Sequence, residues 1–154
     1  MFKLKSRKTK SKDDIDKIFA VIYPVPRTFT NNLFGSEKLV FLKYTPHETI
    51  SDNLKSCKKL LFYESKGEMK IVGEGNIEEI ELLSVDKILE KHQENLHLSE
   101  KELKTYTHGR TKKPVVFTLK NVHRYDKEIK LEKPITMRGK HVTKGEYRNM
   151  LNEE

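Results

Sequence analysis

The segment from residue 18 to residue 46 constrains the fold of this chain most. It holds two apolar runs, Ile18-Phe-Ala-Val-Ile-Tyr23 and Leu39-Val-Phe-Leu-Lys-Tyr44, both rich in β-branched and aromatic residues. Runs of six residues are too short for globular helices, and prolines and a glycine punctuate the connection between them. The sequence therefore predicts a strand, a short helix and a second strand.

Three basic side chains flank these two strands. Arg27 follows the first strand, whereas Lys38 and Lys43 lie around the second, and we expect the connection to bring them toward one region. A basic cluster held by strands is typical of proteins that bind an anionic ligand, and nucleic acid is the commonest large one.

The net charge of +8 is unevenly distributed along the 154 residues. Residues 1–12 hold six Lys or Arg and no acid, residues 64–104 carry a net charge of −5, and residues 105–154 carry +6. Such polarity attracts a polyanion to one side of a molecule, and salt screens the attraction. The alternative is the charged, ion-paired surface of a thermostable protein.

The length fits a single domain over residues 13–154, preceded by a disordered basic arm over residues 1–12. Cys57 is the only cysteine, so the chain forms no internal disulfide and we expect a cytoplasmic protein with an unreactive thiol. No apolar run approaches the ~20 residues of a membrane span. The basic start also lacks the apolar core of a secretory signal.

Further strands are expected after the first two. Residues 59–65 and 68–83 read as two strands joined by a turn at Lys66-Gly67, with glutamates facing solvent between the apolar positions of the second strand. Gly73-Glu-Gly75 interrupts that strand, and glycines there permit a bend. Another strand begins at residue 114 and runs toward residue 125.

Several helices are also predicted. One helical turn is expected near residues 51–55 and a helix over residues 85–93. Ser99 and Glu102 have the spacing of a capping box, which predicts a helix to about residue 107. Thr143 and Glu146 repeat that spacing, which predicts a final helix through residue 151. The fold class is α+β.

Several short motifs, taken with this order of elements, match a known family. They are Tyr23-Pro-Val-Pro-Arg-Thr28, Phe41-Leu-Lys-Tyr44, Val72-Gly-Glu-Gly75, Glu102-Leu103, Tyr106, Gly109-Arg110, Pro114-Val-Val-Phe-Thr-Leu119 and Thr136-Met-Arg-Gly139. The chain resembles the PUA-like superfamily, which includes the ASCH domains, and over about residues 16–151 it is similar to an archaeal PUA-like family of unknown function. The resemblance implies a mixed β pseudo-barrel with helices packed at its openings, and RNA or modified-nucleotide recognition as the recurrent role.

One ASCH-like group hydrolyses acetylated cytidine with a lysine, a threonine three residues later and a distant glutamate. Lys38 matches that lysine, but Phe41 occupies the threonine position, and Glu94 lies in a region that only loosely matches the glutamate segment. A lysine base would also need burial to lower its pKa. Lys38 and Glu94 are therefore the catalytic candidates of a site that lacks one of three groups, and binding is favoured over catalysis.

The candidate nucleic-acid-binding residues supply phosphate contacts and stacking faces. A phosphate at the start of the first helix would also meet free backbone amides. The alternatives are that the tyrosines pack at the edge of the core and that the arginines brace carboxylates. The candidates are Arg27, Thr28, Lys38, Lys43, Tyr44, His47, Tyr106, Arg110, Arg138 and Lys140.

The remaining motifs predict no cofactor and no metal site. The six histidines show no metal-finger spacing and no metalloprotease motif, and are expected to be solvated. Six phenylalanines are assigned to the core because they lie in apolar runs or beside helix ends. They are Phe19, Phe29, Phe34, Phe41, Phe62 and Phe117.

The sequence thus favours a protein that binds RNA (tRNA or rRNA) or a modified nucleotide through a basic cleft. Two alternatives stay open: a small hydrolase that acts on a modified nucleoside or RNA, and a protein-interaction module that uses the acidic surface of residues 64–104. The oligomeric state is left open.

Overall fold

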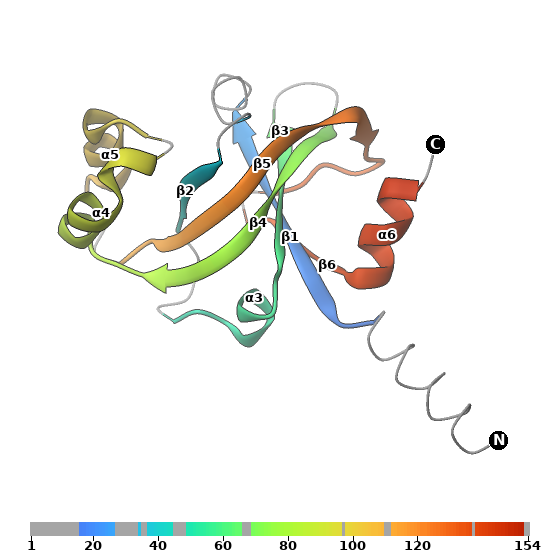
Figure 1. The fold of residues 1–154 in the computed structure, drawn as a ribbon, viewed down its shortest axis with the longest axis horizontal. Coiled ribbons are helices and arrows are strands. Elements are labelled where there is room, and N and C mark those ends of the chain that lie inside the picture. Colours follow the sequence, from blue (N-terminus) through green and yellow to red (C-terminus); the bar gives the residue numbers. More distant parts are fainter. Residues whose placement is uncertain are drawn as a thin grey trace, which may run out of the picture.

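The computed structural model describes residues 16–26, 34, 37–44, 49–65, 69–96, 98–109, 112–136 and 138–152. Within these ranges one mixed sheet has the strand order β2-β5-β4-β3-β1-β6 (Figure 1). Only β1 and β3 pair in parallel; the other neighbours are antiparallel. The strands are β1 (Ile18–Pro26), β2 (Lys38–Lys43), β3 (Lys59–Ser65), β4 (Lys70–Leu82), β5 (Val115–Lys130) and β6 (Lys140–Thr143).

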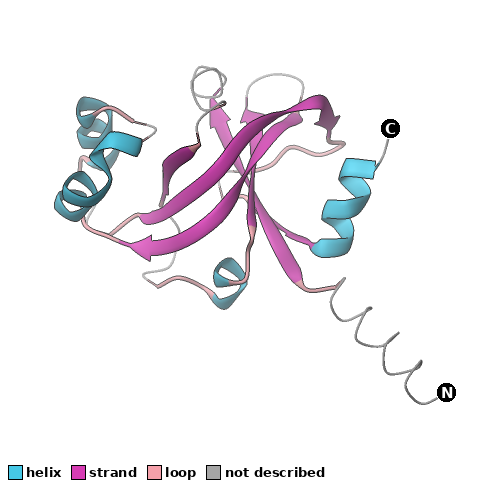
Figure 2. Ribbon diagram, viewed as in Figure 1, coloured by secondary structure: helices cyan, strands magenta, loops and turns pink. Residues whose placement is uncertain are grey.

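Helices lie on two sides of this sheet (Figure 2). A pair of helices with a short 3-10 turn covers the end where β4 finishes, and the last helix lies at the other end. The helical elements are α3 (Asp52–Lys55), α4 (Val85–His92), the 3-10 turn η1 (Gln93–Asn95), α5 (Glu100–Thr107) and α6 (Lys144–Asn152).

The sheet curls until strands that are far apart in its order touch. Three strands separate β1 from β2 in the sheet, yet the rings of Tyr23 and Phe41 lie 6.2 Å apart. Phe62 and Phe117 pack on the same rings, at 5.9 Å from Phe41 and 5.8 Å from Tyr23 respectively. This closed inner face confirms the expected α+β pseudo-barrel.

The paired strands β4 and β5 bend where glycines were expected to permit it. Their register shifts between Ile71 and Gly73 and again between Glu74 and Asn76. A Cβ atom on Gly73 would lie 2.3 Å from the ring of Phe34, so the strand and this ring approach too closely for any other residue. The bend helps the sheet to coil.

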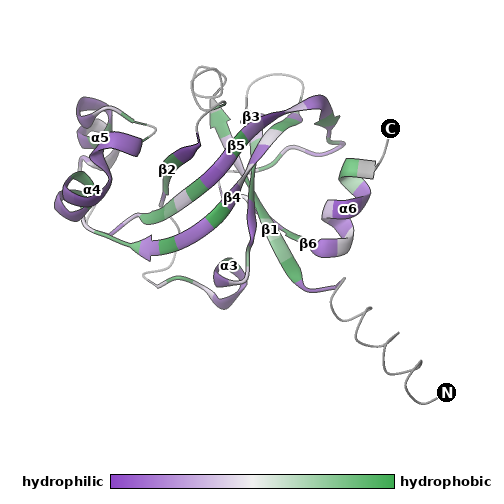
Figure 3. Cartoon of the chain, viewed as in Figure 1, coloured by the Kyte–Doolittle hydropathy of each residue, from purple (hydrophilic) through white to green (hydrophobic). Residues whose placement is uncertain are grey.

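Three apolar clusters explain where the helices sit. The first fills the barrel, and Leu54 of α3 and the nearby Cys57 belong to it. The second lies between the outer face of β1 and α6, and the third between the outer face of β2 and the α4–α5 pair. Hydrophobic residues accordingly run along β1, whereas α5 is largely hydrophilic where it faces outward (Figure 3).

Local signals located most element ends correctly. The Ser99 and Glu102 side chains cap each other's backbone amides as predicted, and so do those of Thr143 and Glu146. The strand β6 was not predicted, because only four residues form it and its pairing with β1 is long-range.

Two expectations about polar residues are wrong. The side chain of Glu81 is only 16% exposed and binds Lys91 and His92, at 2.6 and 3.1 Å, instead of facing solvent. His92 is buried rather than solvated. Both differences arise because α4 packs over the last residues of β4.

Three predictions fall outside the described residues: the short helix after β1, the turn at residues 66–67 and the arm over residues 1–12. Phe29 also lies outside them, whereas Phe41, Phe62 and Phe117 are buried as expected. Within the described part of the chain, no helix is both long and apolar enough to span a membrane.

Candidate nucleic-acid interface

Tyr23 lies where the two edges of the curled sheet approach each other. β2 and β6 are the edge strands, and residues of β2 and the residue just before β6 lie against this ring. Lys43, at the end of β2, places its Nζ 5.4 Å from the ring centroid. Gly139, just before β6, lies so close that a Cβ atom there would be 2.6 Å from Cδ1 of Tyr23. We call this region the seam; it comprises Tyr23, Lys43, Tyr44, Tyr106, Arg138 and Gly139.

Gly139 allows the C-terminal segment to lie against β1. Its φ of +76° is in the left-handed region, and a Cβ atom would meet the carbonyl oxygen of Ile22 at 2.5 Å. Both conditions require glycine. Arg138 and Lys140 are exposed on either side of Gly139 in the sequence. Lys140 pairs with Ile22 and shares the outer face of the sheet with Val142, so its side chain lies on the face opposite to Tyr23.

Lys43 is a buried cation at the rim of the barrel. Side chains alternate along β2, so Lys43 shares the inner face with Leu39 and Phe41, and it is only 6% exposed. Its aliphatic stem packs among apolar groups, and its ammonium group faces the aromatic ring of Tyr23. A positive charge is thereby held beside an aromatic surface.

Tyr44 and Tyr106 form an aromatic pair at the same end of β2. Their ring centroids are 5.3 Å apart and their planes are inclined by 46°. Both side chains are half-buried. Tyr106 comes from the last turn of α5, so the outer helical layer contributes to the seam. Each ring packs against the other, and each side chain keeps an accessible part.

The hydroxyl of Tyr23 stays protonated at neutral pH. Burial raises the pKa of Tyr23 far above its ordinary value, and nearby Cys57 and Tyr106 raise it further. Burial also raises the pKa of Cys57 to about 12, and its Sγ lies 3.4 Å from the backbone oxygen of Asn53. The seam therefore contains a neutral phenol, and the thiol near it is not a ready nucleophile.

Lys38 does not join Lys43. The two residues occupy opposite ends of β2, roughly 16 Å apart at the usual rise of a strand. Their odd spacing also places them on opposite faces, and Lys38 is exposed on the outward face. The sequence-based interpretation that both lysines belong to one region therefore does not describe the observed strand.

Lys38 and Glu94 lie on neighbouring segments without pairing. A bridge between Val40 and Leu96 brings β2 beside the residues that follow η1. Both charged side chains are exposed, and no ion pair within 4.0 Å joins them. Phe41, at the position of the family's threonine, is buried in the barrel. A catalytic triad is not assembled here.

Four candidates cannot be placed: Arg27, Thr28, His47 and Arg110 lie outside the described residues. Among the residues that are described, no group of three or more His, Cys, Asp or Glu side chains could hold a metal ion. Burial lowers the pKa of His141, and its Nε2 has no hydrogen-bond partner within the described ranges.

A buried carboxylate on the outer face of β4 was missed. Glu74 is 3% exposed, and the hydroxyls of Tyr125 and Tyr147 donate to its Oε1 at 2.8 and 2.6 Å. Lys59 lies 2.8 Å from its Oε2 and also donates to Asn76. Burial alone would raise the pKa of Glu74, but the hydrogen bonds hold it below its ordinary value. This cluster ties α6 to the sheet.

Comparisons with known proteins fit this architecture. A family model described as "Domain of unknown function (DUF365)" matches residues 18–144. The chain belongs to this family. A relative, "Uncharacterized protein MJECS03" of Methanocaldococcus jannaschii, is 38% identical over 106 residues, which are 62% of this chain and 98% of that protein.

Solved structures similar to this DUF365 chain are ASCH proteins. The crystal structure of ASCH from Zymomonas mobilis has a TM-score of 0.67 at 17% identity and covers 86% of this chain and 93% of that chain. The structure of a serine-to-alanine variant of the same protein also has a TM-score of 0.67 at 17% identity, and the match covers 90% of this chain and 96% of that chain. The TM-scores show a shared fold, and at identities this low they show the fold alone. The predicted resemblance to PUA-like and ASCH domains is confirmed at the level of the fold.

Proposed function

We propose that this DUF365 protein binds RNA, or a modified nucleotide, at the seam. The observation that carries the proposal is that the Tyr44–Tyr106 ring pair lies near Tyr23, over whose ring the buried Lys43 holds its ammonium group. Accessible aromatic rings next to a cation can stack an unpaired base and hold its phosphate. The exposed Arg138, next to Gly139, supplies further positive charge near Tyr23.

Each group of the seam has a distinct task in this proposal. A base that is splayed from a tRNA or rRNA loop stacks on the accessible part of Tyr44 or Tyr106. The ammonium group of Lys43 and the guanidinium group of Arg138 contact phosphate or carbonyl oxygens. The guanidinium group is planar and can bond two phosphate oxygens at once, which a lysine cannot do. The neutral hydroxyl of Tyr23 is a hydrogen-bond donor.

Binding is better supported than hydrolysis. Lys38 and Glu94 do not pair. The position of the threonine that would complete the hydrolase site is occupied by Phe41, which is buried. Cys57, which lies near Tyr23, is a buried thiol with a raised pKa. We therefore assign RNA as ligand rather than substrate.

Tyrosine substitutions at the seam test the proposal. With fluorescently labelled, unfractionated tRNA as probe, we expect Tyr44→Ala to weaken binding by about 5- to 150-fold, the usual effect of losing one stacked base. Tyr44→Phe keeps the ring and should bind within about twofold of the unsubstituted protein. Equal affinities for all three proteins, or no binding at all, would overturn the proposal.

A further inference from the structure

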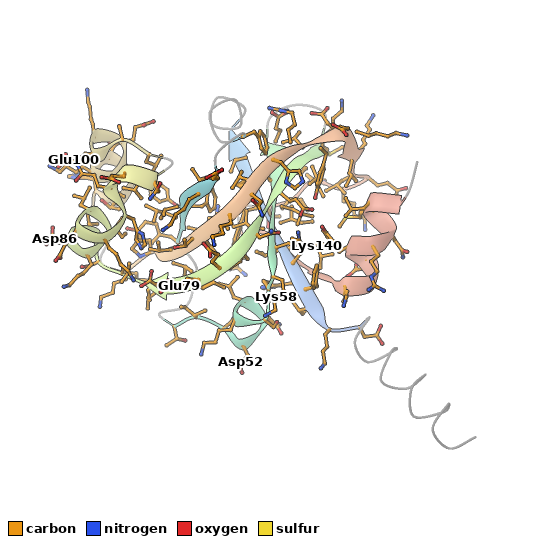
Figure 4. The ribbon with its side chains drawn as sticks, viewed as in Figure 1. Asp52, Lys58, Glu79, Asp86, Glu100 and Lys140 are labelled. Atoms are coloured by element: carbon orange, nitrogen blue, oxygen red, sulfur yellow. The ribbon has the colours of Figure 1, made fainter. Side chains whose placement is uncertain are left out.

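A second positively charged site lies at the start of β1, away from the seam. A hollow of about 630 Å³ opens there between β1, α3 and the first residue of α6. Three lysines line it, Lys17, Lys58 and Lys144, together with a single acid, Asp16. Lys58 is labelled in Figure 4 between α3 and the first half of β1.

Backbone hydrogen bonds fix the positions of the three lysines. The amide of Lys144 donates to the carbonyl oxygen of Lys17 at 3.0 Å. The amide of Lys58 donates to the carbonyl oxygen of Phe19 at 2.7 Å. Lys58 and Lys144 therefore flank the same stretch of β1, each about 5 Å from it as adjacent strands are. The fold itself, rather than chance side-chain conformations, gathers these charges.

Two of the three lysines in the hollow are not paired with an acid among the described residues. Neither Lys17 nor Lys58 has a carboxylate within 4.0 Å in the described part of the chain, whereas Lys91 and Lys120 each pair with a glutamate. Of the acids labelled in Figure 4, Asp86 and Glu100 lie on helices at the far end of the molecule, whereas Asp52 lies on α3 beside the hollow without lining it. Like charges held together repel, so the hollow favours an anion.

The lysines, rather than the start of α6, make this site. The Thr143 amide is bonded to the Glu146 carboxylate at 3.0 Å, and the Glu146 amide to the Thr143 hydroxyl at 3.1 Å. Lys144 opposes the helix dipole at this position, since cations are unfavourable in a first turn. Its Nζ instead lies 5.8 Å from the ring centroid of Phe19.

We propose that this hollow binds backbone phosphates of the RNA whose bases occupy the seam. The inference rests on the proposed function and extends that site along β1. Phe19 and Tyr23 lie about 13 Å apart on this strand, which is about four nucleotides at the spacing of one strand of a duplex.

Charge-removing substitutions in the full-length protein test this inference. The double variant Lys17→Gln and Lys58→Gln removes two exposed charges from the hollow. The matched control, Lys101→Gln with Lys127→Gln, removes two exposed charges elsewhere. The probe is labelled, unfractionated tRNA, titrated between 50 and 200 mM salt. We expect the hollow variant to lower the slope of log K against log salt by about 1.4–1.8, with tRNA binding about tenfold weaker at low salt.

Each outcome decides between the two proposals. A change in slope for the hollow variant alone supports the inference. If the hollow and control variants change the slope equally while Tyr44→Ala still weakens binding, the hollow inference is wrong and the seam stands. If the unsubstituted protein binds no tRNA, both fail. Calorimetric binding of inorganic phosphate that is lost in the hollow variant, with unchanged tRNA affinity, would assign the hollow to free phosphate and overturn the RNA assignment.

Discussion

The hydroxyl of Tyr147 on α6 donates a 2.6 Å hydrogen bond to the buried carboxylate of Glu74 on β4. These two residues are 73 positions apart in the sequence, and their bond fastens the last helix to the outer face of the sheet. α6 also supplies Lys144 to the basic hollow, so the hydrogen bond helps to hold that surface together.

Removing this hydroxyl should destabilise the protein. We expect Tyr147→Phe to lower the free energy of unfolding by about 1.5–3 kcal/mol, because a buried carboxylate loses a donor. Tyr63→Phe is the control, since it lies in the same apolar cluster and its hydroxyl makes no hydrogen bond among the described residues. Urea denaturation measures the free energy of unfolding of both variants. Equal small losses of that free energy would show that the hydrogen bond between Tyr147 and Glu74 does not stabilise the protein.

The same carboxylate should make stability depend on pH. The pKa of Glu74 is lower in the folded than in the unfolded chain, so its contribution is present above its unfolded pKa, about 4.3. That contribution is lost as pH falls through the lower, folded value. We expect the difference in unfolding free energy between the unsubstituted protein and Glu74→Gln to shrink from pH 6 to pH 3.

The exposed Glu132→Gln is the control for this experiment. A stability difference for Glu74→Gln that stays constant between pH 6 and pH 3 would contradict the assignment.

Two glycines with similar backbone angles should respond differently to alanine. Gly139 has a φ of +76° and no room for a Cβ atom, whereas Gly109 has a φ of +74° and open space around it. We expect Gly109→Ala to cost about 1–2 kcal/mol, from the left-handed backbone alone, and Gly139→Ala to cost clearly more. Thermal unfolding of the two variants measures this difference in stability. Equal losses of stability would mean that Gly139 is not packed tightly against Tyr23.

The thiol of Cys57 should react slowly. Because burial raises its pKa to about 12, very little thiolate is present at pH 8. We expect a thiol reagent such as iodoacetamide to modify the folded protein far more slowly than the protein unfolded in guanidinium. Comparable rates in both states would show that the thiol is exposed.

Local patterns predicted most of the secondary structure because capping boxes and apolar runs act within a few residues. The alternation along β2 could also have separated Lys38 from Lys43, since five positions reverse the face of a strand. The burial of Glu74 and the role of Gly139 could not be read in this way. Both depend on contacts with residues distant in the sequence, such as Tyr147 and Tyr23.

The central claim is that the protein binds RNA at the seam without altering it. The most direct test incubates the purified full-length protein with total tRNA and structured RNA at two salt concentrations, then analyses the nucleosides of the retained RNA. We expect selective, salt-sensitive retention with unchanged nucleosides. A changed nucleoside would indicate a hydrolase instead, and no retention at either salt concentration would contradict the RNA-binding function.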